Sequence, residues 1–345
     1  MPSDLLPRSA ERLRRAFDLR IRRGKKRPQA LSTCGYPGRM PRLAYLGPEG
    51  TFTEEALRLL DPTVERLPCA TVSAALNAAR AGDADGAVVP LENSIEGAIT
   101  TTLDEFAWGE PLLITAELLL PVQFSLLAPP GTEIPHIKRV YTHPAAITQT
   151  RAFLARELPD AVVVAAPSTA AAAQEVSLPG SPYDAAIAAR IAGEHYGLVE
   201  LATDIGDRSD TVTRFVRVGR PGALPDPTGS DRTSLVVFLA DDHPGALLEM
   251  LTEFSVRGVN LTRIESRPTG GGIGRYFFHF DFEGHVADAR VGEAIAGLHR
   301  ICGEVRFLGS YPRADGIAPQ IKPGTSNLEF TEAGDWLTRI RAGKV

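Results

Sequence analysis

The order of the predicted helices and strands changes at one short segment, and this change constrains the fold more than any other feature. Residues 221–230 hold three prolines and three glycine or serine residues, which is typical of a linker. Before them, from residue 42 to 219, short apolar runs alternate with helical stretches, a pattern typical of α/β architecture. After them, residues 232–312 follow the β-α-β-β-α-β order of a ferredoxin-like domain. A chain of 345 residues is long enough for two or three domains of about 100–200 residues, so we expect an α/β domain, a linker at 220–231, a smaller domain and a loose tail at 313–345 with one short helix.

The first 39 residues differ in charge from the rest of the chain. They contain 11 lysines and arginines and three acids, a net charge of +8, whereas residues 40–345 carry a net charge of −13. An acidic body disfavours nucleic acid as the main partner, because contact with phosphates needs a basic surface. We expect residues 1–39 to be a disordered extension or, because Met40 directly precedes the first expected strand, not to be translated at all. A targeting role for them is less favoured.

Apolar runs and cysteines argue against several other classes of protein. The longest apolar run, at 112–127, is shorter than the roughly 18 residues of a membrane span and is interrupted by polar residues and a proline, so we expect no membrane partner. The N-terminus lacks the apolar stretch of a secretory signal. Cys34, Cys69 and Cys302 lie far apart, which disfavours a disulfide framework and a zinc site. We expect a cytoplasmic protein without a bound metal ion.

Two polar segments follow predicted strands in the first half of the α/β domain. The glycines of Gly47-Pro48-Glu49-Gly50-Thr51 can turn N–H groups toward an anion, although a tight turn capped by the threonine is equally favoured. This segment has neither a dinucleotide fingerprint nor a P-loop. Glu92-Asn93-Ser94 follows a buried strand, and open α/β sheets bind ligands at the carboxyl ends of their strands. Its carboxylate, amide and hydroxyl groups favour a small polar substrate over a loop that is merely capped.

Three further segments in the second half can be interpreted in more than one way. Ser168-Thr169 is a helix N-cap, and such a cap can also bind a carboxylate. His143 could be a cap, a ligand contact or a packing residue. Thr213 and Phe215 should face one side of the last strand and Arg214 the other, and the planar fork of arginine suits carboxylates. The spacing of these residues does not by itself make a site.

The small domain contains three notable segments. His243-Pro244-Gly245-Ala246-Leu247 opens a helix, and the glycine permits close approach of another backbone or a ligand. Glu265-Ser266-Arg267-Pro268 ends the next strand. The glycine-rich run at 270–274 predicts a hairpin turn and not a nucleotide loop, because no helix follows it.

One family combines these segments in this order. The chain resembles the prephenate dehydratase family, followed by an ACT-like domain, in five segments: Gly47–Phe52, Pro90–Gly97, His143-Pro144, Ser168-Thr169 and Thr213–Phe215. The resemblance covers about residues 42–312. It implies a two-lobed catalytic domain, similar to periplasmic binding proteins, at 42–219, and an ACT regulatory domain at 232–312. It also implies a hydro-lyase that converts prephenate to phenylpyruvate, water and carbon dioxide, on the route to phenylalanine, without a cofactor.

The same resemblance implies roles for single residues. Thr213 would be the catalytic residue, donating a hydrogen bond to the departing hydroxyl group. Eight residues would bind or shape the site for the substrate: Thr51, Phe52, Asn93, Ser94, Ser168, Thr169, Arg214 and Phe215. Six would bind the allosteric effector L-phenylalanine between paired ACT domains of a homodimer or homotetramer: Gly245, Ala246, Leu247, Glu265, Ser266 and Arg267.

The sequence departs from the family pattern at a few positions and leaves two alternatives open. Thr211 stands where the family often has Asn, and Ala145, Ala146 and Thr150 stand where its His-Pro segment often continues with Gln-Ala-Leu and a later Cys. One alternative is arogenate as the substrate, which would give phenylalanine directly. The other is a non-catalytic amino-acid sensor, in which a binding-protein-like part is coupled to the ACT domain.

Overall fold

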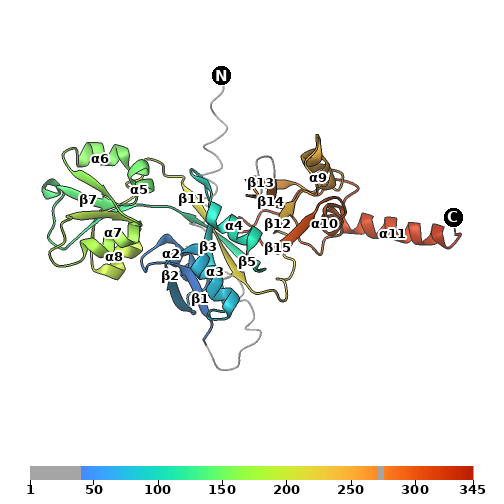
Figure 1. Cartoon of the computed structure of the whole chain (residues 1–345), viewed down its shortest axis with the longest axis horizontal. Helices are drawn as coiled ribbons and strands as arrows, with labels where there is room; N and C mark the ends of the chain where they lie inside the picture. Colours follow the sequence, from blue (N-terminus) through green and yellow to red (C-terminus); the bar gives the residue numbers. More distant parts are fainter. Residues whose placement is uncertain (1–39, 271–275, 345) are drawn as a thin grey trace, which may run out of the picture. The chain divides into compact units, whose positions relative to one another are not determined.

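The computed structural model describes residues 40–270 and 276–344 (Figure 1). The expected extension at 1–39 and nearly all of the glycine-rich turn at 270–274 lie outside the described residues. Both parts of the described chain mix helices and strands, so the α/β class predicted from the sequence is confirmed.

The α/β part contains the elements expected from the alternation of apolar and helical segments, together with several that the sequence did not predict. They are β1 Arg42–Leu46, α2 Phe52–Leu60, β2 Glu65–Cys69, α3 Val72–Ala81, β3 Gly86–Asn93, β4 Gly97–Ala98, α4 Thr100–Trp108, β5 Leu113–Pro121, β6 Ser125–Ala128, a short 3₁₀ turn η1 Ile134–His136, β7 Arg139–Thr142, α5 Pro144–Gln149, α6 Arg151–Glu157, β8 Val162–Ala165, α7 Thr169–Val176, β9 Ala185–Ala188, α8 Arg190–Tyr196, β10 Val199–Ala202 and β11 Val212–Gly219.

These strands form two sheets, one for each expected lobe. The first has the order β2-β1-β3-β11-β5, with β4 paired to β3, and the second has the order β10-β6-β9-β7-β8. In the second sheet β7 is parallel to β8 and β9, whereas β6 is antiparallel to β9 and β10. The central strand β9 is buried along its whole length, which explains its run of small and apolar residues.

The C-terminal part has the β-α-β-β-α-β order predicted from the sequence. Its elements are β12 Asp231–Phe238, α9 Ala246–Ser255, β13 Leu261–Pro268, β14 Tyr276–Glu283, α10 Ala289–Ile301, β15 Glu304–Pro312 and a final helix, α11 Asn327–Arg341. The sheet order is β13-β14-β12-β15, and all its neighbours are antiparallel. Side chains of both helices join one face of this sheet in a core that includes Met250, Phe254, Phe280, Phe282 and Leu298. The ferredoxin-like fold is therefore confirmed.

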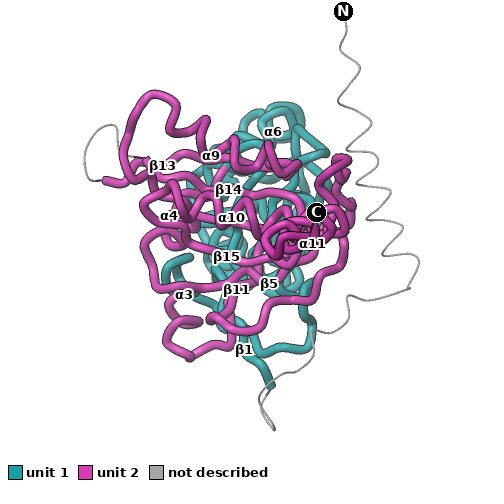
Figure 2. Tube along the Cα trace, turned by 90° about the vertical axis from the view of Figure 1, so that its right-hand side faces the viewer, with its two compact units in different colours: residues 1–75, 88–97, 119–215 teal, residues 76–87, 98–118, 216–345 magenta. Residues whose placement is uncertain are grey.

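The chain divides into two compact units whose boundaries do not follow the linker (Figure 2). Among the described residues, one unit contains 40–75, 88–97 and 119–215, and the other contains 76–87, 98–118, 216–270 and 276–344. The small C-terminal domain therefore shares a unit with α4 and most of β5.

Contacts of side chains explain why α4 and β5 belong to this unit. The ring of Trp108, at the end of α4, lies edge-on to the rings of Phe238 and Phe277, with centroid distances of 5.1 and 5.3 Å. Glu117 on β5 accepts a hydrogen bond of 2.6 Å from the guanidinium of Arg232 on β12. Gly309 on β15 has a φ of 134° and packs against the backbone of β5, where a side chain would collide.

Several elements differ from the sequence-based expectations, among them the following. The strands β2 and β10 were not predicted, because both lie at sheet edges, are largely exposed and so lack an apolar pattern. The helix α8 was not predicted, since it is short and contains Gly193. The tail was expected to hold one short helix near Trp336, which is wrong in length, because α11 has 15 residues.

Candidate active site

Asn93, at the end of β3, contacts Thr213, near the start of β11, and both are residues of the expected site. The side-chain N–H of Asn93 donates a hydrogen bond of 2.9 Å to Oγ1 of Thr213. The other end of the amide is also held, because Asn93 Oδ1 accepts from the backbone N–H groups of Ile95 and Glu96 at 2.9 and 3.0 Å. Both side chains are more than nine-tenths buried. The turn after β3 thus fixes which end of the Asn93 amide faces the threonine.

Arg214 pairs with the residue before Asn93. Its guanidinium Nη1 lies 3.8 Å from Oε2 of Glu92, and the arginine is 4% exposed. Successive residues of a strand face opposite sides. The partners of Thr213 and Arg214, which are neighbours on β11, are Asn93 and Glu92, which are neighbours on β3.

Ser94 ties the turn after β3 to the start of β11. Its backbone N–H donates to the carbonyl of Val212 at 2.9 Å, and its Oγ accepts from the N–H of Val212 at 3.0 Å. The hydroxyl group therefore has a structural partner. This pairing places Val212, and with it Thr213, beside the Asn93 turn.

Thr51 caps the helix α2. Its Oγ1 accepts from the N–H of Glu54 at 3.3 Å and donates to the carbonyl of Leu46 at 3.0 Å. The neighbouring N–H of Gly50 donates to the buried carboxylate of Glu54 at 2.7 Å. In the structure the turn is thus capped, and its Gly50 N–H is used by the protein itself.

Glu54 also anchors a cluster that the sequence did not predict. Its carboxylate lies 2.7 Å from Arg58 Nη2 and 3.0 Å from His195 Nε2 on α8. Burial opposes ionisation of Glu54, but the hydrogen bonds from Gly50 and His195 and the charge of Arg58 outweigh it and hold the pKa of this carboxyl below its usual value. The i, i+4 spacing of Glu54 and Arg58 was visible in the sequence, whereas His195 is 141 residues away.

Two predicted aromatic residues are packing residues in the structure. The ring of Phe52 lies edge-on to that of Phe124, with centroids 5.6 Å apart, and packs against a buried apolar cluster. Phe215 is only 2% exposed.

The other predicted caps behave as caps. Ser168 Oγ accepts from the N–H of Ala171 at 3.0 Å at the start of α7, and Thr169 is the first residue of that helix. His143 Nδ1 accepts from the N–H of Ala145 at 3.2 Å, so His143 caps α5, which is one of the three roles that the sequence left open.

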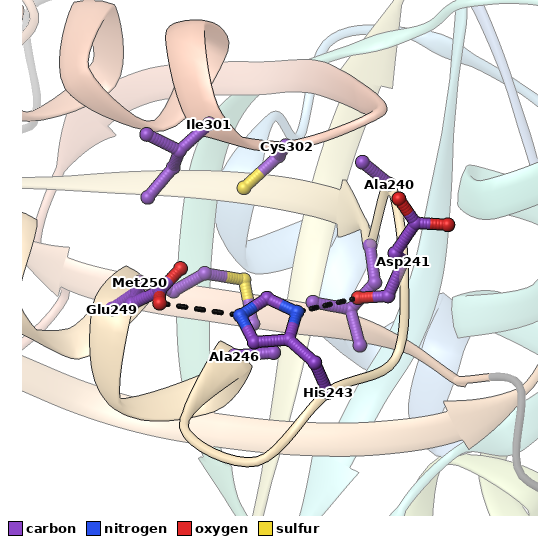
Figure 3. A pocket seen from close by; sticks show the side chains of 9 residues that line it. Ala240, Asp241, His243, Ala246, Glu249, Met250, Ile301 and Cys302 are labelled. Carbon is purple, nitrogen blue, oxygen red and sulfur yellow. Dashed lines mark hydrogen bonds and ion pairs between the residues drawn. The ribbon is translucent and has the colours of Figure 1, made fainter.

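The expected effector residues lie on two different elements. Gly245 precedes α9 with a φ of 99°, a left-handed conformation that favours glycine. Ala246, the first residue of α9, lines a cavity of about 180 Å³ together with Asp241, His243, Glu249 and Cys302 (Figure 3). In Figure 3 the imidazole of His243 lies between the Glu249 carboxylate, at 3.2 Å, and the carbonyl of Asp241, at 3.3 Å.

Glu265, Ser266 and Arg267 lie on the edge strand β13 and do not line that cavity. The guanidinium of Arg267 instead forms a two-pronged pair with the carboxylate of Asp104 on α4, at 3.1 and 2.8 Å. This pairing raises the pKa of Arg267 further above its ordinary value. Of the six expected effector residues, Ala246 alone is among those that line this cavity.

Metal-ligand clusters and membrane-spanning helices are both absent from residues 40–270 and 276–344. Within these ranges, no group of three or more His, Cys, Asp or Glu side chains could hold a metal ion. No helix in that part of the chain is long and apolar enough to cross a membrane.

Comparisons with known proteins match this arrangement. The profile of the family described as prephenate dehydratase matches residues 43–223, and that of the ACT domain matches residues 233–300. A prephenate dehydratase of Amycolatopsis methanolica is 49% identical over 307 residues, which cover 88% of this chain and 99% of the relative.

Two solved structures are also similar. The prephenate dehydratase of Arthrobacter aurescens, in complex with L-Phe, is 50% identical and covers 87% of this chain and 99% of its own, with a TM-score of 0.84. A protein described as a novel type of quorum quenching acylase is 31% identical and covers 79% of this chain and 97% of its own, with a TM-score of 0.71.

The fold and the site define a class, an α/β enzyme joined to a C-terminal ACT domain. Within this class the chain belongs to the prephenate dehydratase family, and it is a hydro-lyase.

Proposed function

We propose that Thr213 assists the departing ring hydroxyl when the chain dehydrates and decarboxylates prephenate to phenylpyruvate. The loss of carbon dioxide and hydroxide makes the ring aromatic, so the reaction is strongly favourable and needs no cofactor as an electron sink. The protein has to supply orientation and a hydrogen bond to the oxygen that leaves. A positioned proton donor contributes typically about 10²–10⁴-fold.

The hydrogen bond between Asn93 and Thr213 carries this proposal. Because Thr213 Oγ1 accepts from Asn93, its own proton is directed away from that bond. Among the described residues Thr213 donates to no protein acceptor, so its proton remains for the substrate. A hydrogen-bond donor held in this way helps most as charge develops on the departing oxygen.

The two carboxylates of prephenate need cationic or N–H partners. We assign this role to the buried Arg214 and to the helix starts at Thr51 and Ser168, with Phe52 and Phe215 shaping the apolar side of the site. Asn93 and Ser94 serve mainly to hold the turn and Thr213, as their hydrogen bonds support. The remaining candidate, Thr169, lies at the start of the helix that Ser168 caps.

Control by L-phenylalanine is the second part of the proposal. The ACT domain and the L-Phe complex of the Arthrobacter aurescens relative support it. Ala246 lines the cavity at the start of α9 whereas Glu265, Ser266 and Arg267 do not, and we assign the effector site to the paired ACT domains of a homodimer or homotetramer. We also place the protein in the cytoplasm, which the free thiols of Cys69 and Cys302 support.

The test is turnover of prephenate by the purified chain, followed by the absorbance of phenylpyruvate in alkali. Thr213→Val keeps the size of the side chain but removes its donor, so we expect turnover to fall by about 10²–10⁴-fold. Thr213→Ser keeps a hydroxyl group and should retain part of the activity. Turnover by Thr213→Val close to that of the parent would refute the role of Thr213.

The same preparation separates the alternatives. Arogenate in place of prephenate would yield phenylalanine directly, so a much higher kcat/KM with arogenate would make it the substrate.

A further inference from the structure

Within residues 40–270 and 276–344, the hydrogen bonds that hold α11 to the rest of the chain lie at its start. Ser326 and Glu329 form a capping box, and Asn327 bonds to both Ala289 and Asp288 at the beginning of α10, at 2.8 and 3.1 Å. From residue 331 to 344 every residue is exposed. Figure 1 shows α11 leading away from α10.

A helix of this kind is marginal on its own in water. Isolated helices shorter than about 12–15 residues are barely stable even in favourable sequences, and Gly334 in the middle weakens this one further. Yet α11 exposes large apolar side chains, with Trp336 57%, Leu337 39% and Ile340 39% exposed. The helix therefore has an apolar face that another surface would be expected to cover.

The apolar side chains form one stripe. Phe330, Ala333, Trp336, Leu337 and Ile340 fall within an arc of about 120° at 3.6 residues per turn. A stripe of this width is typical of a helix that packs against one partner. Leu328 lies outside it, on the opposite side of the helix.

Charges beside the stripe identify the partner. Glu332 and Arg339 lie on the same edge of the stripe, two turns apart. When two identical helices pack antiparallel, the same edge of each helix faces the other copy. Glu332 of one copy would therefore meet Arg339 of the second copy, and Arg339 of the first copy would meet Glu332 of the second. The small residue Ala333 lies on the midline of the stripe and lets the two helices approach closely.

We propose that α11 pairs antiparallel with α11 of a second copy of this chain, through the Phe330–Ile340 stripe and two reciprocal Glu332–Arg339 ion pairs. The length of α11, about 22 Å at 1.5 Å per residue, accommodates both pairs. This surface is separate from the ACT-domain pairing proposed above and does not depend on the roles of the catalytic residues.

The test uses hydrogen–deuterium exchange of the α11 amides in the full-length protein, with the mass in solution from sedimentation. Glu332→Arg places arginine opposite arginine, so we expect exchange of α11 to become about tenfold faster and association to weaken. Arg339→Glu should do the same. The double variant Glu332→Arg/Arg339→Glu restores opposite charges and should return exchange and mass to the values of the parent.

A matched control is Asp335→Arg, which makes the same change of charge on the face opposite the stripe and should leave the mass unchanged. Turnover of prephenate shows that each variant is folded. Three results would overturn the proposal. The first is exchange of the α11 amides in the parent that is as fast as in the single variants. The second is protection that Glu332→Arg does not alter, which would indicate that another segment of the chain covers α11, and the third is protection that arises only when anionic lipid vesicles are added.

Discussion

At the residue scale, Asn93 was expected to bind the substrate, but in the structure its side chain bonds to Thr213. Its amide is oriented by two backbone N–H groups, and so it must present its own N–H to Thr213. We therefore expect Asn93 to act as a positioning residue for the hydroxyl group of Thr213.

Replacing Asn93 by aspartate tests this role with a side chain of the same shape. An ionised carboxylate cannot donate and would instead accept a hydrogen bond from the hydroxyl group of Thr213, so we expect kcat to fall by about 10- to 100-fold with a smaller change in KM. Part of the activity should return as the pH is lowered and the carboxyl becomes able to donate. Steady-state kinetics between pH 5 and 8 measure both effects, and an unchanged kcat would contradict the assignment.

His279 is a second residue whose environment has a measurable consequence. It is 2% exposed on β14, and its Nε2 has no hydrogen-bond partner among the described residues. Burial, and after it the charge of Arg263, lowers the pKa of His279 to about 4, against the opposing charges of Asp281 and Asp104. The folded protein therefore holds this imidazole neutral at a pH where the unfolded chain protonates it.

This difference predicts how stability depends on pH. Because the unfolded state binds more protons between about pH 6.5 and pH 4, the free energy of unfolding should fall as the pH is lowered through this window, by on the order of 3 kcal/mol from this group. In His279→Gln this contribution should disappear. Urea unfolding of the parent and the variant at several pH values measures it, and equal slopes for the two proteins would count against the prediction.

At the element scale, α4 links the residues of the site to the ACT domain in sequence. It begins seven residues after Asn93, and its contacts run to the small domain through Asp104 and Trp108. Removal of the ACT domain would therefore expose the apolar ring at the end of this helix.

Trp108→Ala should lower stability at this contact. The ring is half exposed but meets two aromatic rings, so we expect the free energy of unfolding to fall by about 1–3 kcal/mol. Leu59, which is also about half exposed but lies in α2, offers a comparison, because Leu59→Ala should cost less. Chemical unfolding of both variants measures the difference, and equal losses would argue against a special role for the Trp108 contact.

At the scale of the whole molecule, phenylalanine can control turnover only by binding more tightly to one state of the oligomer than to another. The Arg267–Asp104 pair connects a strand of the expected effector motif to α4. Of the described contacts between α4 and the small domain, this ion pair is the one that includes a residue of the expected effector motif, so we expect effector binding to act on α4 through it.

We expect L-phenylalanine to weaken prephenate binding, and Asp104→Asn to reduce this effect while the amino acid still binds. Coupling between binding sites is typically about 5- to 150-fold and is reciprocal, so a bound substrate analogue should weaken phenylalanine binding by the same factor. Calorimetric titration of each ligand in the presence and absence of the other measures both directions. Full coupling in Asp104→Asn would exclude this pair as the connection.

The sequence by itself determined the α/β class, the ferredoxin-like C-terminal part and the segments that hold Asn93, Thr213 and Arg214. Apolar periodicity, turn residues and local caps are short-range signals, and they predicted the buried strands and the caps at Thr51 and Ser168. The edge strands β2 and β10 were not predicted from the sequence, because exposed strands need no apolar pattern.

Only the tertiary structure decided which polar groups are partners. The bonds from Asn93 to Thr213, from Glu54 to His195 and from Arg267 to Asp104 join residues more than 100 positions apart. No local pattern encodes such pairs, since they form only when strands and helices from distant parts of the chain pack together. For the same reason the exposed stripe of α11 could be recognised as uncovered only once the elements around it were in place.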